Sequence, residues 1–235
     1  MHLQIINKLN KMRLSLIILV ILHTGIVSAQ KFYKTSGGEL IFSRPVNNSP
    51  FANSSSRLRF SAFFHFNNNY HYNFSKSVGF YSGISVSNIG FVYKTGDTIY
   101  KKRAYTVGIP LALKFGKLDN DNFLFAGGEI EIPFHYKQKK ILDIHKEKYN
   151  GFFDKRVNKL LPSIFAGIQF ADGYSFKFRM YLTDFLNKEF TGTDFGYRVE
   201  YKNADSQLFL LSLSYNLKSN KIKKIIKNEE RFAVL

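Results

Sequence analysis

Apolar residues recur at every second position through most of this chain, beginning near residue 38. A period of two is that of a β-strand with one apolar face. In 104–115 the opposite face carries small or polar side chains, whereas the outward face of a soluble β-sandwich is usually long and charged. The pattern therefore favours a strand whose bulky face meets lipid. That bulky face consists of Tyr105, Val107, Ile109, Leu111, Leu113 and Phe115.

Seven further segments show the same alternation. They are 39–43, 57–66, 78–93, 124–137, 163–170, 174–183 and 209–217. The apolar face of the last segment consists of Phe209, Leu211, Leu213 and Tyr215. Eight is an even number that closes a small barrel, and several segments reach the roughly 9–11 residues that a tilted spanning strand needs. We predict an all-β fold, an eight-stranded antiparallel up-and-down transmembrane β-barrel.

The predicted connections alternate in length. Those at 67–75, 116–122 and 171–173 are short, and those at 44–56, 137–159 and 185–203 are long, with a tight turn at 95–98. Bacterial outer-membrane barrels place short turns in the periplasm and long loops outside. We therefore expect both termini on the periplasmic side. No internal repeat or second domain is evident.

The faces opposite the apolar ones carry charge that would point into the lumen. An eight-stranded barrel is just wide enough for side chains to fill it, and buried charges need partners. We expect a salt-bridged plug, in which two carboxylates on one strand face pair with basic residues. A charged pathway, or a carboxylate pair for acid–base chemistry, is the alternative. The predicted set is Arg57, Arg59, Lys114, Glu129, Glu131, Lys177 and Arg179.

The N-terminus has the pattern of a secretory signal peptide. Basic residues precede the apolar run 14–22, and small residues follow up to Ala29 and Gln30, where we expect cleavage. Met12 is an alternative start, and no Cys follows the cleavage site to make a lipoprotein. The predicted organisation is a signal peptide at 1–29, a barrel at 30–217 and a basic tail at 218–235, which forms a short amphipathic helix or is frayed.

A net charge of +17 raises the question of nucleic acid. The charge is spread along the chain, no nucleic-acid motif accompanies it, and an exported protein rarely meets nucleic acid, so we expect none as a partner. Outer-membrane lipid and lipopolysaccharide fit better. The segment 137–159 has eight Lys or Arg and three Asp or Glu, so it is either a solvated loop or a clamp on lipopolysaccharide phosphates.

Catalytic and cofactor motifs are missing from the sequence. Cysteine is absent, the six histidines lack metal-ligand spacing, and no Ser lies in a Gly-x-Ser-x-Gly turn. We therefore expect no enzymatic activity, no cofactor and no metal. A barrel enzyme acting on lipid and a narrow pore are the alternatives. The rival fold is a soluble, lipocalin-like barrel, in which the apolar stripe would point inward.

Several strings resemble a known group of proteins. They include "YTVGIPLALKFG", "GGEIEIPFHYK", "LPSIFAGIQF" and "DSQLFLLSLSYNL". These resemble the PorT-like or OmpA-like outer-membrane β-barrels of Bacteroidetes, over about residues 37–217. The resemblance implies an eight-stranded barrel in the cell outer membrane, with secretion-machinery proteins as possible partners because some relatives serve type IX secretion or gliding. It transfers no functional residues. The tail after Leu217 departs from barrels that end on their last strand.

Overall fold

A computed structural model of the chain describes residues 32–219. The predicted signal peptide, with its cleavage site, lies outside the described residues, as does the predicted tail beyond its first two residues. No helix within 32–219 is long and apolar enough to cross a bilayer.

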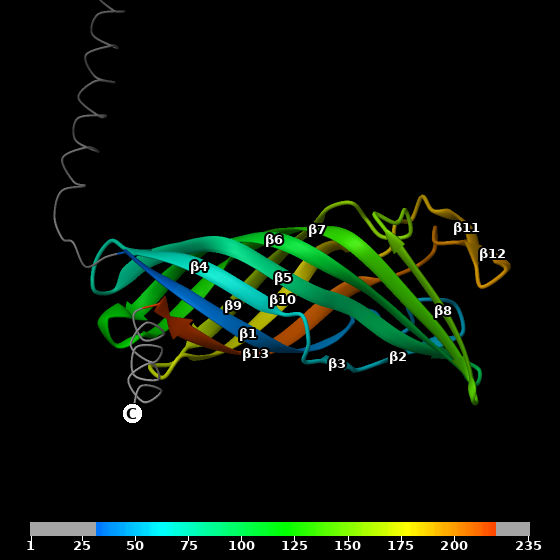
Figure 1. Cartoon of the computed structure of the whole chain (residues 1–235), viewed down its shortest axis with the longest axis horizontal. Coiled ribbons are helices and arrows are strands. Elements are labelled where there is room, and N and C mark those ends of the chain that lie inside the picture. Colours follow the sequence, from blue (N-terminus) through cyan, green and yellow to red (C-terminus); the bar gives the residue numbers. More distant parts are fainter. Residues whose placement is uncertain (1–31, 220–235) are drawn as a thin grey trace, which may run out of the picture. The chain divides into compact units, whose positions relative to one another are not determined.

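The described chain is almost entirely β-structure (Figure 1). Its elements are β1 (Phe32–Pro45), β2 (Ser54–Arg57), β3 (Arg59–Ser61), β4 (Phe66–Asn73), β5 (Val78–Thr95), β6 (Thr98–Lys117), η1 (Leu118–Asn120), β7 (Asn122–Leu142), β8 (His145–Phe152), β9 (Leu161–Gln169), β10 (Tyr174–Asp184), β11 (Thr191–Asp194), β12 (Tyr197–Glu200) and β13 (Gln207–Lys218).

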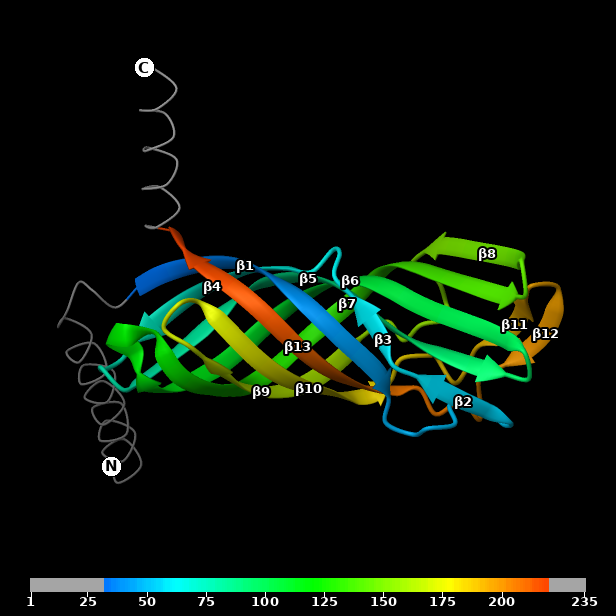
Figure 2. The same cartoon turned by 90° about the horizontal axis from the view of Figure 1, so that it is seen from below.

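Eight of these strands close into a ring. The order is β13-β10-β9-β7-β6-β5-β4-β1, each pair is antiparallel, and β1 pairs with β13 from Thr35↔Lys218 to Pro45↔Leu208. The closing pair lies side by side in Figure 2. The predicted eight-stranded antiparallel up-and-down barrel is therefore confirmed.

The exterior of the ring carries the predicted apolar stripes. On β6 the stripe residues alternate with buried ones, and Ile109 and Leu111 are 64% and 60% exposed. On β13, Phe209, Leu213 and Tyr215 are exposed and Leu211 is half-buried between neighbours. The ten steps from Tyr105 to Phe115 cover about 33 Å of strand, or about 25 Å across a bilayer at a tilt near 40°. The soluble-barrel alternative, with this stripe inside, is wrong.

The two ends of the barrel differ, and we call them the turn end and the loop end. The turn end has short connections, at 74–77, 118–121 and 170–173, and also holds the start of β1 and the end of β13 (Figure 1). The loop end has the long segments, including the β5–β6 and β7–β8 hairpins and the small β11–β12 sheet.

The second predicted strand along the chain differs from the strand in the structure, β4. A strand at 57–66 followed by a turn at 67–75 is wrong, because β4 occupies 66–73 and the true turn follows it. The three consecutive asparagines at 67–69 resemble a turn signal, but they lie between β1 and β5 and pair with both. Pairing on two sides overrides the local preference, and a polar lumen tolerates the amide side chains of Asn67 and Asn69.

The segment 137–159 also differs, because most of it is not a loop. β7 continues to Leu142 and β8 pairs back along it. A β-bulge at Pro133 and Phe134 adds one residue to β7, which reverses the facing of everything beyond it. Tyr136, expected on the apolar outer face, is therefore buried inside, whereas His135 and Lys137 lie on the outer wall.

Candidate functional site

The middle of the lumen is filled by a cluster around Arg179, on β10. Its guanidinium forms ion pairs with Glu129 and with Glu131, the latter at 3.3 Å, and all three side chains are buried. The two carboxylates share one face of β7, as the period of two requires. Ser85 donates a hydrogen bond to Glu129, while Thr106 and Tyr181 donate to Glu131. The structure thus brings these three predicted residues together as one network.

A second lumen pair lies beside this cluster. Lys177 Nζ is 2.7 Å from Glu39 Oε1, and both side chains are nearly buried. Sequence reasoning missed Glu39, although it lies two residues before Ile41 and four before Ser43, whose side chains also point inward. The period of two through 39–43 was the available signal.

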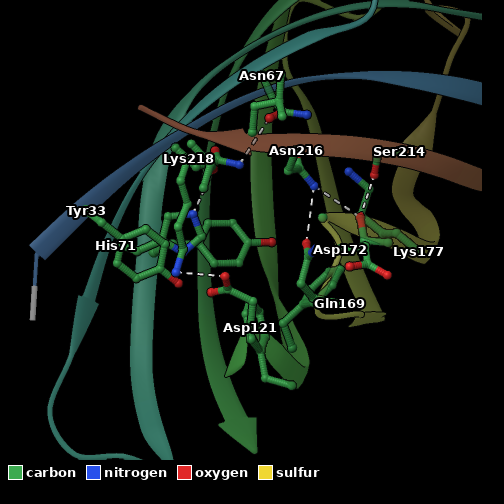
Figure 3. A pocket seen from close by; sticks show the side chains of 18 of the residues that line it. Tyr33, Asn67, His71, Asp121, Gln169, Asp172, Lys177, Ser214, Asn216 and Lys218 are labelled. Atoms are coloured by element: carbon green, nitrogen blue, oxygen red, sulfur yellow. Dashed lines mark hydrogen bonds and ion pairs between the residues drawn. The ribbon is translucent and has the colours of Figure 1, made fainter. Parts of the chain in front are cut away.

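Lys114 fills the lumen near the turn end and stands apart from the carboxylates. Its Nζ is 2.7 Å from Asn73 Oδ1, 3.3 Å from Tyr33 Oη and 3.3 Å from His71 Nδ1. Close by, Lys218 pairs with Asp121 at 2.7 Å (Figure 3). The pocket there has about 50 Å³ of free space, enough for a few water molecules. The turn end of the lumen is therefore largely filled by side chains.

Arg57 and Arg59 lie outside the carboxylate network. Arg57 is exposed on β2, a short strand that pairs with β5 and is separated from β4 by a break in the wall. Arg59 reaches across a break in the wall, where it donates hydrogen bonds to the carbonyl oxygen of Asn88 at 3.0 Å and to Asn88 Oδ1 at 2.7 Å. The prediction that both arginines serve as partners for the lumen carboxylates is wrong, since within 32–219 neither arginine forms an ion pair with Glu129 or Glu131.

The loop end has its own buried ion cluster. Asp194 pairs with Lys102 at 2.9 Å and with Arg156 Nε at 2.7 Å, and Tyr201 donates a hydrogen bond to it. Although burial opposes ionisation of the carboxyl, Lys102 and the hydrogen bonds hold the pKa of Asp194 well below its usual range. Burial lowers the pKa of Lys102 to about 8, against the opposite effect of Asp194. Long-range loop contacts assemble this cluster, so the strand pattern did not reveal it.

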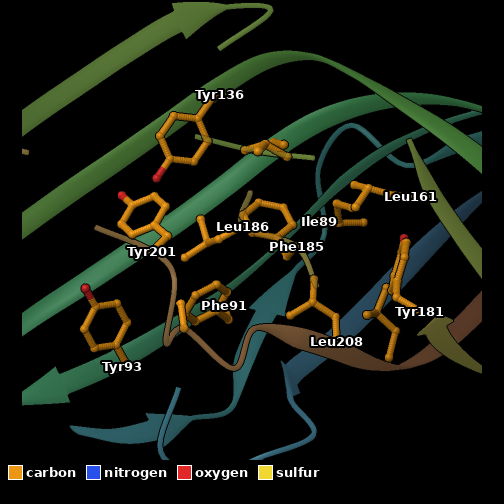
Figure 4. Packing of buried hydrophobic residues seen from close by; sticks show 14 of the residues in the cluster. Ile89, Phe91, Tyr93, Tyr136, Leu161, Tyr181, Phe185, Leu186, Tyr201 and Leu208 are labelled. Carbon is orange, nitrogen blue, oxygen red and sulfur yellow. The ribbon is translucent and has the colours of Figure 1, made fainter. Parts of the chain in front are cut away.

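Around this ion cluster the loop end is packed with apolar side chains (Figure 4). Ile89 and Phe91 from β5 meet Leu186 and Leu208 from the opposite side of the ring, and all four are almost fully buried. The long segment between β10 and β13 thus folds back into the mouth of the barrel. The lumen is closed at this end by a small hydrophobic core.

The arrangement favours a plug over a reactive centre. Both carboxylates that could serve acid–base chemistry are held by Arg179 and are almost inaccessible. Among residues 32–219, no group of three His, Cys, Asp or Glu side chains is placed to hold a metal ion. The ion pairs and hydrogen bonds of the lumen neutralise its buried charged side chains and join strands from opposite sides of the ring.

No protein-family model matches this chain, and no curated protein matches it. Solved structures of Ail, the attachment invasion locus protein of Yersinia pestis, are similar to it. One is 13% identical, with a TM-score of 0.36, and covers 80% of this chain and 99% of Ail. A second, of Ail in complex with the heparin analogue sucrose octasulfate, is 12% identical, with a TM-score of 0.35, and covers 80% and 98%. Likeness at this level carries no argument about function.

Proposed function

We propose that this chain is a bacterial outer-membrane β-barrel protein with a structural or interaction role and no enzymatic activity. One observation carries the proposal: a belt of exposed apolar side chains encircles an interior that is filled by paired charges. A soluble protein rarely exposes so large an apolar surface. The turn end faces the periplasm and the loop end faces outside, as in other bacterial barrels.

The filled interior supports this role over a pore. The carboxylate cluster occupies the middle, the apolar core closes the loop end, and the turn end has little free space. Ions crossing the barrel would have to break the buried pairs around Arg179, at a high energetic cost. The function then lies on the outer surface and at the loop end.

The test uses the full chain in cells and after purification. Outer-membrane fractionation, with heat-modifiable mobility of the detergent-solubilised protein, is expected to show a folded barrel in that membrane. Planar bilayers that contain the purified protein should show no channels. Recovery in the soluble periplasmic fraction, or steady single-channel currents, would refute the proposal.

Lipopolysaccharide is the partner that we propose at the loop end. The β7–β8 hairpin carries much of the basic charge of 137–159 on its outer wall, above the apolar belt, where phosphates of the outer leaflet would lie. Binding of purified lipopolysaccharide to the reconstituted barrel, measured against a lipid without phosphates, tests this contact.

A protein partner is the second candidate, and one observation favours it. Ile144, Phe153 and Tyr197 at the loop end are each more than two-thirds exposed, although this end lies above the apolar belt. Exposed apolar residues outside the bilayer are typical of protein contacts. The resemblance to PorT-like barrels makes components of a secretion or gliding machinery the first partners to seek, by pull-down from membranes with the triple Ser variant of these residues as control.

A further inference from the structure

The wall of the barrel has a break near the loop end, between β3 and β5 (Figure 2). Residues 87–91 of β5 have no strand partner on that side, because β4 stops pairing at Val86 and β2 begins at Val92. Side chains replace the missing ladder. His65 Nδ1 accepts from the Asn88 N–H at 3.3 Å, Arg59 donates to the Asn88 carbonyl, and Ser43 donates to the Gly90 carbonyl at 2.7 Å.

The chain opposite this break bulges outward and forms one wall of a groove. Eight residues, 58–65, span the distance that five residues of β5 cover, and Phe64 adopts a left-handed backbone conformation, with φ of 64°. The groove that results has a volume of about 750 Å³. Leu58, Phe60 and Phe63 line it and are each more than half exposed. Arg57 and Arg59 line the groove as well, so this wall offers apolar side chains together with two cations.

The other wall of the groove is basic. Register places Lys101 of β6, Lys139 of β7 and Lys148 of β8 directly opposite one another, with Arg103 and Lys137 forming the next row. Like charges placed opposite one another destabilise a sheet unless an anion neutralises them. None of these five residues forms an ion pair within 32–219, and the groove lining contains no Asp or Glu.

The electrostatics of Lys139 agree with this arrangement. Burial, together with the neighbouring Arg103, Lys148, Lys101 and Lys146, lowers its pKa. The acid of β8, Glu147, does not relieve the repulsion, because it pairs with Lys140 at 3.0 Å, one position out of phase with the basic rows. The basic wall therefore lacks a counter-charge.

An aromatic layer fixes the depth of the groove. Tyr105, His135 and Phe152 stack in sequence across β6, β7 and β8, with ring centroids 5.6 and 4.4 Å apart. They lie between the apolar belt and the basic rows, and Lys137 and Arg103 lie 5.4 and 5.9 Å from the Tyr105 ring. Aromatic rings of this kind mark the membrane–water interface, so the basic rows lie at the level of lipid phosphates.

We propose that this groove is a binding site for one lipid of the outer leaflet whose headgroup carries at least two phosphates, such as the lipid part of lipopolysaccharide. The phosphates contact the rows of Lys101 and Arg103, and an acyl chain lies along Leu58, Phe60 and Phe63. The inference rests on the proposed function, because only a barrel with its loop end outside presents the groove to that leaflet.

The test is a binding titration of the full-length, purified barrel in detergent with the diphosphorylated lipid, read by native mass spectrometry. The variant K101Q/R103Q is expected to weaken binding roughly tenfold or more. The matched control K159Q/K202Q removes the same charge from exposed loop positions outside the groove and should bind as the parent does. A second variant, L58N/F63N, keeps the charge and should also weaken binding, through the acyl contact.

Heat-modifiable mobility first establishes that each variant is folded. Equal weakening in K101Q/R103Q and K159Q/K202Q would show unspecific attraction and overturn the site. If inorganic pyrophosphate displaces the lipid at an equal concentration, the groove binds phosphate anions without recognising the acyl chain, and this outcome would also overturn the lipid site. If the protein is a folded, non-conducting barrel in the outer membrane but does not bind the lipid, this inference is refuted and the proposed function is left intact.

Discussion

The middle of the barrel and its loop end are built from the same strands, yet only the loop end adds an apolar core to its buried ion pairs. In the middle, the inward side chains are Ser85, Glu129 and Arg179; at the loop end they are Ile89, Phe91 and Leu208. The exteriors differ as well: the middle carries the apolar stripe of β6, and the loop end carries the basic rows above it. Where lipid surrounds the barrel, the apolar side chains face outward and polar side chains fill the interior. Where water surrounds it, apolar side chains form a core inside.

The change occurs within single strands and over two residues. On β13 the inward residues pass from Leu208 and Leu210 to Ser212 and Ser214. On β5 they pass from Ser87 to Ile89. On β5 this boundary lies beside Tyr105 of the aromatic layer, because Ser87 and Ile89 pair with Thr106 and Ala104 on either side of it.

The largest effect is expected from breaking the charged middle. Arg179→Met leaves Glu129 and Glu131 buried without their cation, and we expect a loss of about 3–5 kcal/mol in the free energy of unfolding. Urea titration followed by heat-modifiable mobility measures it. The triple variant E129Q/E131Q/R179M removes the uncompensated charge and should recover most of the loss; a triple variant as unstable as Arg179→Met would contradict the account.

A smaller and more local effect is expected at the loop end. Leu186→Ala opens a cavity in the apolar core and should cost about 2–3 kcal/mol. Hydrogen exchange should show that the loss is confined to the loop end, with the strands around Arg179 still protected. The comparison fails if protection falls equally along β6 and β10. Leu160→Ala, at an exposed position, is the matched control.

The smallest effect concerns pH and separates the two ion clusters. The pKa of Asp194 is depressed by folding, so its contribution is complete above the unfolded value of about 3.9 and is lost as pH falls below it. We expect hydrogen-exchange protection factors at the loop end to be roughly tenfold lower at pH 3 than at pH 5. Asp194→Asn should remove this dependence, whereas Glu200→Gln, in an exposed pair, should retain it.

Most of the ring was predictable from the period of two, because lipid outside and a narrow lumen inside constrain every residue of a spanning strand. Glu129, Glu131 and Arg179 could be named for that reason. The second strand was misplaced because Asn67, Asn68 and Asn69 favour a turn only where no neighbour pairs with them.

The loop end could not be predicted in the same way. Its core joins β5 to the segment that follows β10, and its ion cluster joins Lys102 to Asp194, 92 positions away. Such contacts leave no local period in the sequence. The break in the wall was also hidden, since 58–65 alternates as a strand although it pairs with only one neighbour over 59–61.

The bulge at Pro133 and Phe134 acts on β7 as an insertion acts on a reading frame. Below it, even-numbered residues face the lipid; above it, odd-numbered ones face the water. One added residue thus shifts the alternation of inward and outward residues within a single strand, at the point where its surroundings change from lipid to water. Closing the bulge with both residues kept would force one phase throughout, expelling Tyr136 and Gln138 from the core and drawing the lysines of the outer wall inward. Deleting Phe134 instead removes the extra residue and leaves both side chains inside. The bulge is therefore as much a part of the design of this strand as any side chain.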